Sequence, residues 1–167
     1  MQNPREKGTQ FEKQVIQFLQ TVLGERATVG RPLSPIEGAS GMWQPDIMIG
    51  TGGHFDPEPR EVDGMKVFDG VLPTVKAVLE CKYAEPADSG SSFDTNLARA
   101  YRELNDIGLE NSDIKLFVIV NREPRKGEQS RNYGKLFANI RVEFLDFNDL
   151  DDRERLKIES LSIITSP

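Results

Sequence analysis

Residues 114–120 are nearly all apolar, and this short run constrains the fold more than any other feature of the chain. Strand side chains alternate between two faces, so a strand without polar positions is covered on both sides. Such a strand lies in the middle of a sheet, with helices packed on each face. The order of helix, strands, helix, apolar strand, helix and strand along the chain predicts an α/β fold with a mixed central sheet flanked by helices.

The spacing of apolar residues places the other elements. The first helix is expected over 9–23, with Thr9 as its N-cap and Gly24 as its end. Two more helices are expected around 93–107 and 130–138, with a turn or short helix at 149–155. Strands are expected at 27–31, 46–49, 74–83, 114–120 and 141–145, and a last strand at 157–164.

The chain has 167 residues, which suits one domain with a sizeable core, predicted here over 1–167. Residues 50–72 separate two predicted strands and are too many for an ordinary hairpin loop. We therefore expect an insertion or long loop at about 50–72, with a small hairpin around 65–68 inside it.

Two polar motifs lie at the ends of predicted strands. Pro45-Asp46 opens the run 46–49, and Glu80-Cys81-Lys82 closes the run 74–83. Glu80 and Lys82 are two residues apart and share a face, while Cys81 points to the opposite face, into the core. Phosphodiester hydrolysis needs a hard cation held by oxygen ligands and a cationic or proton-handling group beside the attacking water. Asp46 and Glu80 offer the first, and Lys82 offers the second.

Glu12 stands out within the first predicted helix. At about 100° per residue it falls between Leu19 and Leu23, inside the apolar stripe. A buried carboxylate persists when it is paired or holds a metal, so Glu12 is a candidate site residue. The alternative is that Glu12 lies at the edge of the stripe and snorkels or pairs with a lysine.

The helix, the Pro-Asp strand and the Glu-x-Lys strand, in this order, resemble the PD-(D/E)xK nuclease superfamily, which has the fold of many restriction endonucleases. The resemblance spans about residues 7–120. It implies a restriction endonuclease-like core in which Asp46 and Glu80 bind Mg²⁺, with Mn²⁺ able to substitute. It also implies that Lys82 orients or activates water and that Glu12 completes the acidic cluster.

A second set of residues is similar to the archaeal Holliday-junction resolvases of that superfamily. In those enzymes a Ser-Gly loop before the Pro-Asp strand approaches the site, which is the place of Ser40 here. The acidic net charge and the long segment after residue 50 depart from that pattern. The residues that carry the similarity are Lys7-Gly8, Phe11-Glu12, Arg31, Ser40-Gly41, Pro45-Asp46 and Glu80-Cys81-Lys82.

The net charge of −6 is unusual for a protein that binds DNA, because phosphate contacts rely on Lys and Arg. The charges are unevenly distributed, however: residues 121–141 hold six basic residues against two acidic ones, whereas 142–167 is acidic. The basic segment contacts DNA or is simply a solvated face. The candidate DNA-binding residues are Arg31, Ser40, Arg122, Arg125, Lys126, Arg131 and Lys135.

Composition excludes several other kinds of site. One cysteine allows neither an intramolecular disulfide nor a cysteine-rich zinc site, and one histidine, His54, is too few for a histidine zinc site or triad. Cys81 within an apolar strand indicates a buried thiol in a reducing compartment, so we expect a cytoplasmic protein. Trp43 beside the site either stacks on a base or covers the edge of the core, and we favour the core.

Membranes and nucleotide cofactors are also not expected. No apolar run approaches the roughly 18 residues of a membrane span, and the start of the chain has no signal-peptide apolar region. The glycines at 50–53 lack the Gly-Lys-Ser/Thr ending and the following helix of a phosphate-binding loop.

The sequence thus favours a Mg²⁺-dependent endodeoxyribonuclease that cleaves duplex DNA in the manner of a restriction enzyme. A Holliday-junction resolvase or another structure-specific nuclease uses the same chemistry and remains an alternative. A non-catalytic DNA-binding protein on the same fold is the second alternative, which the acidic charge favours. We expect a homodimer, because one site cuts one strand and two symmetric sites cut two.

Overall fold

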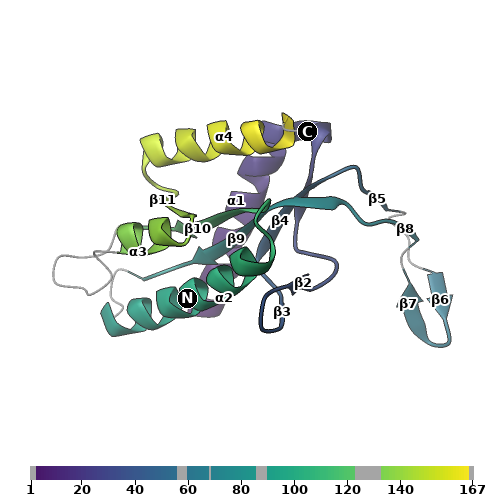
Figure 1. Cartoon of the computed structure of the whole chain (residues 1–167), viewed down its shortest axis with the longest axis horizontal. Coiled ribbons are helices and arrows are strands. Elements are labelled where there is room, and N and C mark those ends of the chain that lie inside the picture. The colour runs from purple at the N-terminus through teal and green to yellow at the C-terminus, as the bar shows by residue number, and fades with distance from the viewer. Residues whose placement is uncertain (1–2, 56–59, 68, 86–89, 123–132, 166–167) are drawn as a thin grey trace.

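A five-stranded mixed sheet forms the centre of the computed structural model, which describes residues 3–55, 60–67, 69–85, 90–122 and 133–165 (Figure 1). The strand order is β1-β4-β9-β10-β11. The first three strands are antiparallel neighbours, and β9, β10 and β11 run parallel. The strands are β1 (Thr28–Gly30), β4 (Ile47–Thr51), β9 (Thr74–Lys82), β10 (Lys115–Val120) and β11 (Val142–Asp146).

Four helices cover the two faces of the sheet. Helices α1 (Pro4–Leu23) and α4 (Leu150–Thr165) pack on one face, and α2 (Gly90–Glu110) and α3 (Tyr133–Asn139) pack on the other. Helices α2 and α3 lie in the two crossovers between parallel strands, the usual way to join such strands. None of the described helices is long and apolar enough to cross a membrane.

The apolar strand β10 lies between these layers, as its sequence predicts. Phe117 and Ile119 belong to the core under α1 and α4, while Leu116 and Val118 belong to the core under α2 and α3. Strand β9 alternates in the same way, with Leu79 and Cys81 on the α1 side. The predicted α/β architecture with a mixed sheet is confirmed.

Helix α1 begins earlier than its apolar spacing predicts. Asn3 is the N-cap, and its side chain accepts a hydrogen bond from the Glu6 N–H while the Glu6 side chain accepts one from the Asn3 N–H. This capping box, with Pro4 at the first helical position, adds a polar turn before the apolar stripe. The prediction of Thr9 as N-cap is therefore wrong; its hydroxyl donates to the Arg5 carbonyl inside the helix.

The prediction of a last strand over 157–164 is also wrong, because these residues belong to α4. Asp149 accepts a hydrogen bond from the Asp152 N–H at the start of this helix. Leu156 and Ser160, four residues apart, are the buried positions. That spacing is helical, and the helix turns its apolar residues against α1 and the sheet.

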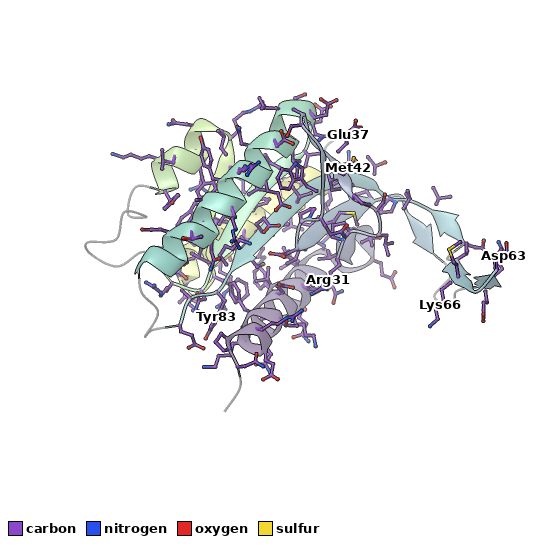
Figure 2. All side chains as sticks on the ribbon, turned by 90° about the horizontal axis from the view of Figure 1, so that it is seen from below. Arg31, Glu37, Met42, Asp63, Lys66 and Tyr83 are labelled. Atoms are coloured by element: carbon purple, nitrogen blue, oxygen red, sulfur yellow. The ribbon has the colours of Figure 1, made fainter. Side chains whose placement is uncertain are left out.

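The segment between β4 and β9 forms an arm of short strands that projects away from the sheet (Figure 1). Strands β5 (His54–Phe55) and β8 (Gly70–Val71) pair near the body, and β6 (Arg60–Val62) pairs with β7 (Met65–Val67) beyond them. Figure 2 shows Asp63 and Lys66 at its far end. We call residues 54–71 the arm; its β6–β7 hairpin confirms the hairpin predicted around 65–68.

A second small hairpin lies beside the body, ahead of β4. Its strands are β2 (Ile36–Glu37) and β3 (Met42–Trp43), with a single turn of 3-10 helix, Gly24–Arg26, earlier in the chain. Figure 2 shows Glu37 and Met42 close to one end of α2. This hairpin leads directly into the strand that begins after Asp46.

Candidate active site

Asp46 and Glu80 are linked by hydrogen bonds between the start of β4 and the end of β9. Because Ile47 pairs with Leu79 in an antiparallel register, the residue before β4 lies beside Glu80. The Asp46 N–H donates to Glu80 Oε1 at 3.1 Å, and the Cys81 N–H donates to Asp46 Oδ2 at 2.8 Å. Each carboxylate thus caps the backbone of the other strand, which fixes both side chains at the same edge.

Lys82 completes a charged group on the α2 side of the sheet. Its Nζ lies 2.7 Å from Glu80 Oε2, and Glu80 is only 3% exposed. Burial raises the pKa of Glu80 to about 8; the Lys82 charge opposes this effect, and the Asp46 and Glu103 charges add to it. Burial works to lower the pKa of Lys82, but the charges of Glu80 and Asp46 prevail and raise it. Lys82 is therefore a cation.

Glu103 of α2 joins this group, and the sequence reasoning missed it. Burial raises the pKa of Glu103, against the Lys82 charge and a hydrogen bond with Glu80. The Glu103 carboxyl is therefore a neighbour of both Glu80 and Lys82. Glu103 Oε1 is buried, and no group in the described residues hydrogen-bonds to it. The sequence does hold one indication of Glu103: on a helical wheel it lies about 40° from Ile107, at the edge of the apolar stripe of this helix.

Glu12 reaches the same edge of the sheet from α1. It is half-buried, and its Oε2 lies 3.2 Å from Arg31 Nη2. Burial and the charge of Asp46 raise the pKa of Glu12, while Arg31 and Lys82 oppose them. Glu12 therefore lies within electrostatic range of Asp46 and Lys82, and its ion-pair partner is an arginine rather than the lysine considered as an alternative.

The donor set fits a hard divalent cation. Its atoms are carboxylate oxygens, and the buried, unpartnered Glu103 Oε1 offers one more acceptor beside Glu80. Within the described ranges, no group of three or more His, Cys, Asp or Glu side chains is arranged to hold a metal. Mg²⁺ typically takes one or two carboxylates and completes its shell with water and substrate phosphate. Asp46 and Glu80 suffice for such a site.

The candidate DNA-binding residues are dispersed around this edge and beyond it. Arg31 is exposed beside Glu12, and Ser40 is exposed in the β2–β3 hairpin. Arg122 follows β10 and places its guanidinium 4.8 Å from the centre of the Phe93 ring. Lys135 is exposed on α3. Arg125, Lys126 and Arg131 lie outside the described residues.

Cys81 and Trp43, the two uncharged residues considered beside the site, both pack in the hydrophobic cores. Cys81 is 7% exposed in the core under α1 and α4, and burial raises the pKa of its thiol, so it is the buried thiol that its strand position predicts. Trp43 packs against the α2 core, as favoured from the sequence, and its indole N–H donates to Asp106. That carboxylate is a further residue the sequence reasoning missed.

Comparison with solved structures places this fold. NucC from E. coli MS115-1 matches at a TM-score of 0.60 with 15% identity, over 100% of this chain and 83% of that one. NucC from P. aeruginosa ATCC27853 matches at 0.59 with 14% identity, over 100% and 84%. Both were solved in their cAAA-bound form. No protein-family model and no curated protein matches the sequence.

At these identities the likeness shows the fold alone. It agrees with the predicted α/β fold, in which helices flank a mixed central sheet, and shows that this fold is similar to that of NucC. It lends no support to the similarity with archaeal resolvases, since the neighbours found are NucC proteins.

Proposed function

We propose that this chain is a metal-dependent DNA endonuclease that hydrolyses phosphodiester bonds in duplex DNA. The observation that carries the proposal is the mutual capping of Asp46 and Glu80 across β4 and β9, with Lys82 on Glu80. A restriction endonuclease-like core presents these groups together at one sheet edge. A protein that only bound DNA would not need a buried acid-base pair there.

Asp46 and Glu80 would hold Mg²⁺ or Mn²⁺, and Glu103 and Glu12 would add negative charge around it. The cation, when bound, supplies charge stabilisation for the phosphate and lowers the pKa of water. The charges of Glu80 and Asp46 raise the pKa of Lys82, which favours a role as a cation that orients a water or a phosphate oxygen. The mutual capping keeps the two carboxylates in place before substrate arrives.

The remaining parts of the proposal concern substrate and assembly. Arg31, Arg122 and Lys135, together with the basic segment beyond β10, would contact the DNA backbone. A homodimer would place two such sites on the two strands of a duplex. A junction substrate needs the same chemistry, so the assay below includes one.

A nucleotide ligand belongs in the same assay. The sequence argued against a nucleotide cofactor because a glycine-rich phosphate loop is missing, which excludes only sites built on that motif. Both NucC structures hold cAAA, so the wider exclusion has no support from the comparison.

The test is cleavage of supercoiled plasmid and of a synthetic four-way junction, with Mg²⁺ or Mn²⁺, with and without cAAA, and with an EDTA control. We expect metal-dependent cutting of plasmid by the wild type, and about a 10²- to 10³-fold lower rate for Lys82→Ala. Lys115→Ala is the matched control, because Lys115 also pairs with a carboxylate but at the opposite end of β10. No metal-dependent cutting of either substrate under any condition would refute the proposal.

A further inference from the structure

Asp106 of α2 accepts hydrogen bonds from the β2–β3 hairpin, which precedes the candidate metal ligand Asp46. Its Oδ2 accepts a hydrogen bond from Trp43 Nε1 at 2.6 Å. Both of its oxygens lie 3.1 Å from the Ser40 N–H, and its own backbone carbonyl accepts from the Ala39 N–H at 3.0 Å. Asp106 is only 9% exposed. Residues far apart in the sequence are thus tied to one carboxylate.

The hairpin is shaped to allow this contact. A Cβ on Gly38 would lie 2.4 Å from Asp106 Oδ2 and 2.8 Å from Trp43 Nε1, so only glycine leaves room for the hydrogen bond. Asn111 adds a second tie, because its side-chain amide donates to the Glu37 carbonyl at 2.6 Å. The hairpin is therefore held against the C-terminal part of α2 at more than one point.

Each residue from this tie to the active site is fixed in turn. Gln44, which follows Trp43, donates from its side chain to the Pro32 carbonyl at 2.8 Å. Pro45 is buried, and its ring restricts φ. The Asp46 N–H then meets Glu80 Oε1. A displacement of Trp43 would therefore pass along three residues to the candidate metal ligand.

We propose that Asp106 is a positioning residue for the active site, which fixes Trp43 and thereby sets where Asp46 stands. The inference rests on the proposed nuclease function, in which Asp46 binds the cation. Asp106 touches none of the reacting groups. Its role is to hold the incoming strand from the side of α2, the same helix that brings Glu103 to Glu80.

Asp106→Asn is the variant of closest shape. The amide replaces one carboxylate oxygen with an NH₂ donor and removes the negative charge. Asp106→Asn therefore loses the two-oxygen contact with the Ser40 N–H and weakens the hydrogen bond from Trp43. Trp43→Phe removes the same hydrogen bond from the other side. Glu110→Gln, an exposed carboxylate on the same helix, is the matched control.

Three readouts separate positioning from general stability. Trp43 is the only tryptophan, so acrylamide quenching of its fluorescence reports directly on the tie. Mn²⁺ affinity, measured by titration calorimetry without DNA, reports on Asp46. Cleavage of plasmid gives kcat and KM separately, and misplacement of a metal ligand lowers kcat more than it raises KM.

For Asp106→Asn we expect stronger quenching of Trp43, about 10-fold weaker Mn²⁺ binding, and a kcat about 10- to 100-fold lower with KM within about 2-fold. Trp43→Phe should weaken Mn²⁺ binding in the same direction. The double variant should be no worse than Asp106→Asn alone, because both changes break one interaction.

A folded Asp106→Asn protein with altered Trp43 quenching but wild-type Mn²⁺ affinity and kcat would overturn the inference. If Asp106→Asn fails to fold, Trp43→Phe decides by Mn²⁺ affinity and kcat, because it lacks the tryptophan that the quenching measurement needs. If the wild type cuts no DNA, the nuclease proposal fails, whereas the Mn²⁺ titrations still test whether Asp106 positions Asp46.

Discussion

The core pair β4–β9 and the arm pair β6–β7 are both antiparallel, yet they differ in how deeply they are buried. In the core pair, residues 47–50 and 77–81 are buried, and the charged groups gather where β4 begins and β9 ends. In the arm, every residue from 60 to 66 is exposed. The same antiparallel pairing is therefore shielded from solvent in the core and exposed to solvent in the arm. Only the shielded pair can hold a buried glutamate beside a lysine.

The arm keeps its shape by local means. Asp63 and Gly64 both have positive φ, as a tight two-residue hairpin turn requires. Arg60 forms a two-point ion pair with Asp69. Two-stranded hairpins are marginal in water, and the exposed Val62, Met65 and Val71 give this one no core of its own. We therefore expect the arm to add little to the stability of the candidate active site.

The largest effect should come from truncating the core. Phe117→Ala removes a fully buried ring between α1, α4 and the sheet, so we expect the free energy of unfolding to fall by about 3–5 kcal/mol. Val62→Ala in the arm should change it by less than about 0.5 kcal/mol. Urea unfolding followed by circular dichroism gives both values, and similar losses for the two variants would erase the contrast between core and arm.

The parts of the site that strand periodicity governs could be predicted from the sequence. Glu80 and Lys82 share a face, and Cys81 faces the core, because side chains alternate whatever the rest of the chain does. Asp46 could be predicted as a site residue in the same way, because it lies at the start of the neighbouring strand. These are local properties of runs of residues.

The missed residues depend on contacts between distant segments. Asp106 meets Trp43 across 63 positions and Ser40 across 66, and no local pattern encodes those distances. Residues 157–164 of α4 are predicted as a strand because this short apolar run fits either period, and the aspartate that caps the helix, Asp149, lies eight positions before the run. The N-terminal capping box at Asn3 and Glu6 was overlooked in the same way.

The buried Glu80 should make stability depend on pH. Its pKa is raised from 4.5 to about 8, so the folded state holds a proton that the unfolded state has lost between these values. Without divalent metal, the free energy of unfolding should therefore fall as pH rises from about 5 to 8, by at most about 1.4 kcal/mol per pH unit.

Urea unfolding at several pH values in EDTA measures this dependence. Glu80→Gln, which stays neutral, should flatten it, and Glu110→Gln in α2 should leave it unchanged. In the proposed function a bound cation would take the place of the proton, so saturating Mg²⁺ should also reduce the fall. Stability that rises with pH across this range would show that Glu80 is ionised in the folded state.

A smaller effect should come from the join between core and arm. A Cβ on Gly50 would lie 2.7 Å from Pro73 Cβ and 3.2 Å from the Thr74 carbonyl, at an irregularity in the β4–β9 pairing. Gly50→Ala should therefore cost about 1–3 kcal/mol. Gly30→Ala in edge strand β1, where a Cβ meets nothing within 4 Å, is the control and should be nearly neutral. Equal urea midpoints for the two would contradict this.

The smallest effect should come from removing the arm altogether. Thr51 pairs with Thr74, so an Asn-Gly turn in place of residues 52–73 would close β4 onto β9 as a two-residue hairpin. The free energy of unfolding should change by less than about 1 kcal/mol, and Mn²⁺ affinity should stay within about 2-fold, because none of the arm residues that the structure describes contributes to the acidic cluster or to either core. Calorimetric titration and urea unfolding of the shortened chain measure both, with Asp46→Asn as the variant that must lose Mn²⁺. A shortened chain that folds but binds Mn²⁺ poorly would mean that the exposed strands hold the buried pair in register, and the division between the two regions would then be false.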